Sequence, residues 1–195
     1  MTSLRILTAF FMLVLSVSAQ TKWIADKAHT NINFTVAHMV ISEVTGKFRD
    51  FDAAMEATKP DFTDASINVT IKAKSIDTGN DRRDGHLRSA DFFNADVDSI
   101  ITFVSKKMEK INDTDYKLYG ALTMRGVTKD VVLDVKFKGK IFSQSGDRIA
   151  FKASTTIKRM DWGLQWNRTI ETGELLVGEN VGLNIIIEFV SPRKS

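Results

Sequence analysis

The chain has 195 residues, of which 43% are hydrophobic and 26% are charged, with 11 glycines and 2 prolines. This composition is typical of a globular protein and argues against disorder, a collagen-like repeat and low complexity. Because it has no cysteine and a net charge of only +3, the chain offers no disulfide framework, no thiol nucleophile, no cysteine-ligated metal and no strongly basic surface for nucleic acid.

Residues 1–19 have the layout of a secretory signal peptide. A basic residue precedes an apolar stretch over residues 6–15, and the small residues Ser-Val-Ser-Ala at 16–19 suit a cleavage site. The apolar stretch of about ten residues is too short for a transmembrane helix, which needs roughly 20. We therefore predict cleavage near Ala19 and a single mature domain over residues 20–195. This mature protein is expected to be periplasmic or secreted and to have no transmembrane segment.

The mature chain reads almost entirely as β-strands, because apolar and polar residues alternate with a period of two. Turns that contain glycine, asparagine or aspartate separate several of the strands, as at Arg125-Gly126. Strands with one apolar face, joined by such turns, predict an antiparallel meander. The expected strands are 32–38, 45–54, 65–73, 101–107, 116–124, 131–138, 149–158 and 181–189.

About eight such strands form either a sandwich or a closed barrel, and closure removes exposed sheet edges. The interior of such a barrel holds packed side chains or one slender ligand. Two segments interrupt the alternation, residues 75–95 and residues 159–179, and both contain arginine and aromatic residues. Long connections in a compact β-domain are often functional, because they lie at the mouth of the scaffold.

Short motifs recur in a fixed order along the mature chain. The most specific are SIDTG at 75–79, RDGHL at 83–87 and SADFF at 89–93. The others are Trp23–Asp26, His29–Phe34, Val44–Phe48, Ile101–Phe103, Gly120–Thr128, Arg159–Leu164 and Val177–Val181. Together these motifs resemble the YceI-like family of exported, lipocalin-like polyisoprenoid-binding proteins. This family commonly has phenylalanine where the chain has Trp162, and the larger ring is expected to alter the shape of the pocket.

The resemblance implies an all-β fold, a single antiparallel eight-stranded lipocalin-like β-barrel with a short helical or irregular loop near residues 80–95. It also implies a bound polyisoprenoid lipid, either a polyprenyl phosphate or an isoprenoid quinone, and a homodimer. We therefore expect a protein that binds, transports or stores this lipid and is not an enzyme. No cofactor other than the lipid ligand, and no metal, is expected.

The lipid tail is expected to contact the inward-facing side chains of the barrel. Each buried methylene contributes about 0.8 kcal/mol, so apolar contact alone can hold a long prenyl tail. The candidate tail residues are Phe34, Val36, Phe48, Ile71, Phe92, Phe103, Leu122, Leu133, Phe151, Trp162 and Ile185. A phosphate or quinone head group would lie at the mouth, among polar side chains. The candidate head-group residues are His38, Asp84, His86, Arg88 and Arg159.

Several alternatives stay open at this point. The inward aliphatic residues could fill the barrel as a solid core, and Phe92 and Phe93 could plug its end. The arginines of residues 82–88 could pair with neighbouring aspartates on a solvated face instead of meeting a head group.

An enzymatic alternative rests on the histidines. His29, His38 and His86, with Asp84, could serve a lipid-directed hydrolase or isomerase. Imidazole and carboxylate are also zinc ligands, but the spacing of these residues is not diagnostic. The chain has no HExxH, Gly-x-Ser-x-Gly or P-loop motif, and we predict no catalytic residues.

Overall fold

The computed structural model describes residues 21–142, 146–169 and 176–191. The predicted signal peptide lies outside these residues. The strands are β1 (Thr21–Ala25), β2 (Asn31–His38), β3 (Ser42–Phe48), β4 (Phe51–Ala57), β5 (Ser66–Lys72), β6 (Ile76–Asp77), β7 (Ile100–Lys110), β8 (Asp115–Met124), β9 (Val127–Ile141), β10 (Arg148–Lys158) and β11 (Val177–Val190). The helices are α1 (Asp81–Arg88) and the 3₁₀ turns η1 (Ala73–Ser75) and η2 (Arg159–Trp162).

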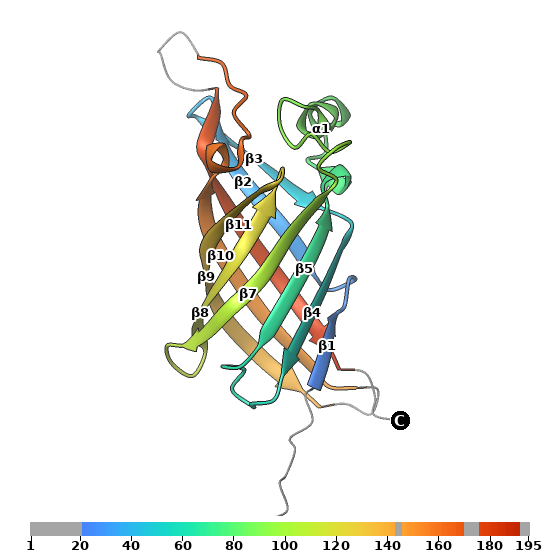
Figure 1. Ribbon diagram of the computed structural model, residues 1–195, viewed down its shortest axis with the longest axis vertical. Helices are drawn as coiled ribbons and strands as arrows, with labels where there is room; N and C mark the ends of the chain where they lie inside the picture. The colour runs from blue at the N-terminus through green and yellow to red at the C-terminus, as the bar shows by residue number, and fades with distance from the viewer. Residues whose placement is uncertain (1–20, 143–145, 170–175, 192–195) are drawn as a thin grey trace, which may run out of the picture.

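The strands form a closed antiparallel β-barrel (Figure 1). Around the ring the order is β1-β4-β5-β7-β8-β9-β10-β11, and β11 pairs with β1 to close it. Strand β2 also pairs with β11, and β3 pairs with β2. β1 and β2 are thus two halves of one bent strand, as are β3 and β4. This arrangement confirms the predicted all-β fold and the eight-stranded antiparallel barrel.

The period-two pattern separates the inside of the barrel from the outside, as predicted. In β8 the side chains of Tyr116, Leu118, Leu122 and Met124 are buried, and the residues between them are more exposed.

The predicted strand over residues 45–54 is divided, because the backbone bends at Arg49-Asp50 between β3 and β4. The predicted turn at Arg125-Gly126 joins β8 to β9, and both residues have positive φ, 49° and 69°. Such a two-residue turn matches the twist of the strands it connects.

Helix α1 lies at one end of the barrel, which we call the mouth end (Figure 1). The helix begins after Asn80, whose side chain accepts a hydrogen bond from the Arg83 backbone N–H at 3.0 Å. It confirms the short helix expected near residues 80–95. No helix in the described part of the chain is long and apolar enough to cross a membrane.

A group of charged side chains, which we call the polar clamp, connects the segment between β1 and β2 to β10 and β11. The Arg148 guanidinium donates to Asp26 Oδ2 at 2.8 Å and also to Glu188 on β11. Asp26 Oδ2 also lies 3.1 Å from His29 Nδ1. The hydrogen bond from Arg148, followed by that from His29, lowers the pKa of Asp26 to about 2. Ligand atoms of Asp26, His29 and Glu188 lie within 4.8 Å of one another, and Arg148 supplies the positive charge between the two carboxylates.

We predict that Asp26→Asn lowers the thermal unfolding midpoint by a few degrees at neutral pH. The pKa of Asp26 is depressed in the folded protein, so its carboxylate stabilises the fold above the usual pKa of 3.8 and loses this effect as the pH falls through about 2. The variant should therefore lose less stability than the parent between these two pH values. Unfolding midpoints measured across this pH range test the prediction.

The matched control is Asp52→Asn, which removes an exposed ion pair with Lys27. Exposed pairs of this kind contribute little to stability, so this variant should keep the acid profile of the parent. An unchanged profile in the Asp26 variant as well would show that the polar clamp does not stabilise the fold.

Candidate functional site

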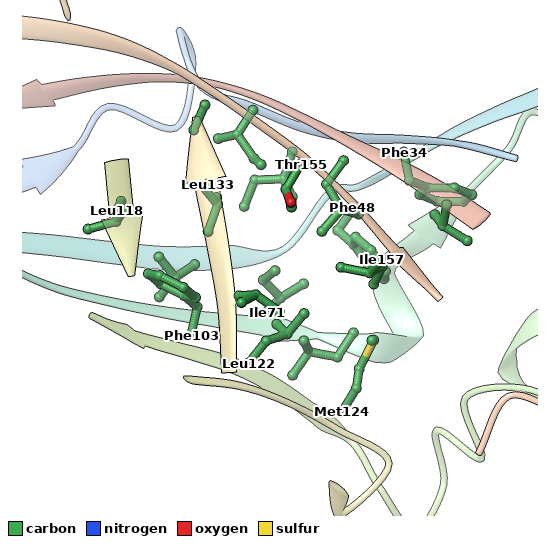
Figure 2. A pocket seen from close by; sticks show the side chains of 18 of the residues that line it. Phe34, Phe48, Ile71, Phe103, Leu118, Leu122, Met124, Leu133, Thr155 and Ile157 are labelled. Carbon is green, nitrogen blue, oxygen red and sulfur yellow. The ribbon is translucent and has the colours of Figure 1, made fainter. Parts of the chain in front are cut away.

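The barrel encloses a long cavity whose wall is almost wholly hydrocarbon (Figure 2). The cavity has a volume of about 210 Å³. Apart from Thr155 and Arg159, every side chain that the described residues contribute to the lining is apolar. The barrel is therefore hollow, in contrast to the solid core that the sequence left open.

Most of the residues predicted to hold a lipid tail lie on this wall. Those that line the cavity are Phe34, Val36, Phe48, Ile71, Phe92, Phe103, Leu122, Leu133, Phe151 and Ile185. Trp162 lies outside the lining. Its side chain is buried, and its Nε1 donates a hydrogen bond to the Leu122 carbonyl at 3.0 Å. The indole therefore fixes η2 against β8 and does not shape the cavity wall directly.

Two glycines keep large rings out of the centre of the cavity. A Cβ on Gly46 would lie 2.3 Å from the Phe34 ring, and a Cβ on Gly120 would lie 2.3 Å from the Phe103 ring. Gly46 is directly opposite Phe34 across the β2–β3 pair. Each ring therefore lies against the backbone of a neighbouring strand, in space that a side chain would otherwise occupy. This close approach lets the wall carry aromatic rings while the interior stays open.

The end opposite the mouth is closed by aromatic packing. Phe62, in the loop between β4 and β5, is 5% exposed and lies over the rings of Phe137 and Phe151, with centroid distances of 5.6 and 5.5 Å. Phe137 and Phe151 are themselves 5.3 Å apart. Phe151 also lines the cavity. The loop that carries Phe62 and helix α1 lie at opposite ends of the barrel (Figure 1), so the cavity has one closed end.

At the mouth end a second hollow adjoins the cavity, and its lining combines apolar side chains with polar and basic ones. It shares Phe34, Val36, Leu87, Phe92 and Val177 with the cavity. The polar side chains that line it are His38, Asn80, Arg82, Arg83 and His86. The apolar cavity thus opens into a region where cationic and imidazole groups gather.

Two of the predicted head-group residues, His38 and His86, line this mouth hollow. The His86 ring stands edge-on to the rings of Phe92 and Trp166, with centroids 5.1 and 4.7 Å away. Its Nε2 lies 2.8 Å from Asp91 Oδ2. These contacts fix the orientation of the imidazole at the mouth.

Arg159, a third predicted head-group residue, lines the inner cavity and is 3% exposed. Its guanidinium donates to the backbone carbonyls of Gly178 at 2.9 Å, Trp166 at 3.0 Å and Val177 at 3.1 Å, and also to that of Leu164. Burial lowers the pKa of Arg159 because the charged form loses its hydration. Arg159 thus organises the segments around the mouth while it presents a cation to the cavity.

The remaining two predicted head-group residues, Asp84 and Arg88, line neither hollow. Buried Asp84 accepts hydrogen bonds from the Thr78 backbone N–H at 2.9 Å and from its hydroxyl at 2.5 Å. Arg88 donates to the carbonyls of Lys74 and Ile76, both at 2.8 Å. Both side chains anchor α1 to the segment that precedes it.

The groups of the enzymatic alternative do not gather at one place. His38 and His86 line the mouth hollow, whereas Asp84 is bonded to Thr78 and His29 contacts Asp26 at the strand joint. The ion pairs suggested for the arginines of residues 82–88 are not found in the described part of the chain. Arg83 instead donates to the Thr78 hydroxyl at 2.7 Å.

The family model of the YceI-like domain matches residues 23–189. The chain belongs to the YceI-like family. A UPF0312 protein of Staphylococcus epidermidis is 36% identical over 171 residues, which cover 87% of this chain and 97% of the relative. The crystal structure of a YceI protein of Campylobacter jejuni is 36% identical, with a TM-score of 0.70, and the match covers 86% of this chain and 96% of that one.

Two more distant structures share the fold. Burkholderia cenocepacia BcnA has a TM-score of 0.73 at 21% identity, and the match covers 84% of this chain and 98% of BcnA. A polyisoprenoid binding domain from Saccharophagus degradans has a TM-score of 0.62 at 18% identity, over 87% of this chain and 98% of that domain.

The wall of this YceI-like barrel also includes residues that were not predicted individually. Met108 on β7 and Leu118 on β8 line the cavity, and the alternation that found their neighbours would also find them. Leu87 on α1 and Leu164 after η2 also line it. Neither residue belongs to a strand, so the alternation of apolar and polar residues cannot identify them. Their segments reach the cavity only through the tertiary fold.

We predict that Gly46→Ala reduces the affinity of this YceI-like protein for an apolar fluorescent dye several-fold. The new Cβ would meet the Phe34 ring at 2.3 Å and the Thr78 methyl at 2.8 Å, so Phe34 must move at the passage between cavity and mouth. Dye titration measures the effect. Gly85→Ala, in α1, is the control because a Cβ there meets nothing within 4 Å. Equal affinity in both variants would contradict the role given to Gly46.

Proposed function

We propose that this protein binds a polyisoprenoid lipid, a polyprenyl phosphate or an isoprenoid quinone, inside its barrel and carries or stores it without altering it chemically. The observation that carries the proposal is the hollow interior, where Thr155 and Arg159 are the only polar side chains that the described residues contribute to the lining. A slender hydrocarbon matches such a wall, because no buried polar group is left unpaired by it.

The energetics favour a long tail. About 20 buried methylene equivalents contribute roughly 16 kcal/mol of gross apolar stabilisation. The loss of free motion and the ordering of a flexible chain cost roughly 4–15 kcal/mol. Apolar contact along the barrel therefore suffices to retain a prenyl chain without a specific polar contact.

The mouth suits a polar head group. His38, His86 and Arg82 line it, and imidazole and guanidinium groups donate hydrogen bonds to phosphate or carbonyl oxygens. In this proposal the tail provides affinity and the head group fixes orientation. The similarity in fold to the polyisoprenoid binding domain of Saccharophagus degradans supports the same class of ligand.

Two further properties belong to the proposal. The signal-peptide pattern of residues 1–19 supports cleavage near Ala19 and a location in the periplasm or outside the cell. The family resemblance supports a homodimer, which sedimentation equilibrium of the mature protein would test.

Native mass spectrometry of the freshly isolated mature protein tests the lipid directly. We expect a non-covalent adduct with the mass of an isoprenoid lipid, which is lost when the protein is denatured. The absence of any adduct, together with no binding of added prenyl phosphate or quinone, would contradict the proposal.

We predict that Ala153→Phe abolishes lipid retention and leaves the protein folded. Ala153 lines the cavity from β10, so a ring there would obstruct the tail. In a solid core the added ring would cost about 1–3 kcal/mol, whereas the open cavity can accommodate it. The variant should therefore keep an unfolding midpoint close to that of the parent.

The matched control is Ala150→Phe, which adds the same ring to the outer face of β10. Ala150 alternates with the buried residues Ile149 and Phe151, so this variant should retain lipid as the parent does. Full retention of lipid in the Ala153 variant would show that the cavity is not the lipid site.

A further inference from the structure

The hairpin between β2 and β3 ends in three consecutive apolar residues that project into solvent. Met39, Val40 and Ile41 are 41%, 58% and 89% exposed. They connect His38 and Ser42, which form the last pair between the two strands. A single exposed apolar residue is ordinary, but a contiguous apolar group at a projecting point marks an interaction surface. We call residues 39–41 the apolar tip.

The backbone of the apolar tip is unfavourable for the residues that occupy it. Met39 has a φ of 53° and Val40 a φ of 66°. Positive φ is uncommon for residues other than glycine and asparagine, and for a β-branched residue such as valine it is a genuine outlier. Exposed side chains form few contacts that could offset this strain. A local conflict without structural compensation indicates a functional role for the side chains.

The apolar tip lies at the mouth end of the barrel. The β2–β3 hairpin and helix α1 are at the same end (Figure 1). The Met39 backbone N–H donates to the Leu176 carbonyl at 2.9 Å, and Leu176, Ala37 and Val44 line the mouth hollow. An apolar path therefore runs from the base of the apolar tip into the cavity.

We propose that the apolar tip inserts into the surface of a lipid bilayer and docks the barrel with its mouth against the membrane. A stable protein partner typically buries about 800 Å² on each side, which is more than three side chains at a hairpin turn provide. A fluid bilayer needs no complementary shape, and shallow insertion of a few apolar side chains suits it.

Charge at the mouth agrees with a membrane partner. Arg82 and His38 line the mouth hollow, and their side chains have no hydrogen bond or ion pair with the described residues. Both can meet lipid phosphate groups when the apolar tip is inserted. The choice of a bilayer rests on the proposed function, because a lipid that passes directly between membrane and cavity does not expose its tail to water.

The test replaces the apolar tip with polar, turn-forming residues in one variant, Met39→Asn, Val40→Gly and Ile41→Ser. Asparagine and glycine tolerate positive φ, so the unfolding midpoint should be unchanged or higher than that of the parent. Binding to vesicles of phosphatidylcholine and phosphatidylglycerol, measured by flotation, should fall about tenfold or more. A merely structural role of the apolar tip would instead lower the midpoint.

The matched control is Phe142→Ser. Phe142 is 75% exposed and follows β9, at the end of the barrel opposite the mouth, so vesicle binding should be unchanged. Strong binding by the tip variant, loss of binding in the Phe142 variant, or no binding by the parent would each overturn the proposal. A change of oligomeric state in the tip variant would also overturn it, because the apolar tip would then contact a second copy of the chain.

Native mass spectrometry of the same samples separates this proposal from the proposed function. A tip variant that retains its lipid but does not bind vesicles supports docking and leaves the lipid site intact. A parent that binds vesicles through the apolar tip but carries no lipid, and takes up none, supports docking and contradicts the proposed lipid function.

Discussion

Closure of the sheet is the constraint on which the rest of the structure depends. Around the ring each strand is hydrogen-bonded on both sides, and the β1–β11 pair completes the ring. A sandwich must fill the space between its sheets with interdigitated side chains, whereas a closed ring is held by its own backbone hydrogen bonds. The wall can therefore surround empty space. An apolar cavity lowers stability, and a ligand that fills it in the folded state raises stability again.

Ring closure requires a bent strand, and the bend could not be predicted from the sequence. The alternation of β8 and β10 shows which side chains point inward, and it identified Leu122 and Phe151 as lining residues. The joint between β1 and β2 depends on Arg148, which lies 122 residues from Asp26 along the chain. No local pattern links residues so far apart. The same holds for Phe62, which closes the barrel end through contacts with β9 and β10.

The charged residues of the two irregular segments show a second limit of sequence reasoning. The sequence marked Asp84, Arg88 and Arg159 as residues of one kind, because arginine and carboxylate groups in long loops often bind ligands. In the fold, Asp84 and Arg88 anchor α1, whereas Arg159 organises four backbone carbonyls and still reaches the cavity. Composition reveals that a group is polar, but only tertiary contacts reveal which partners already satisfy it.

Because aromatic side chains around Phe62 close one end of the barrel, the cavity opens only at the mouth end in the described part of the chain. Among the described residues, Phe62 covers the far end through Phe137 and Phe151, so a guest molecule would enter tail first and leave head first through the mouth. The length of the cavity then selects ligands by the length of their chain. A chain shorter than the cavity would leave a void at the closed end, and a longer one would keep its polar end outside. Ligands that differ only in chain length would therefore be held with different strength.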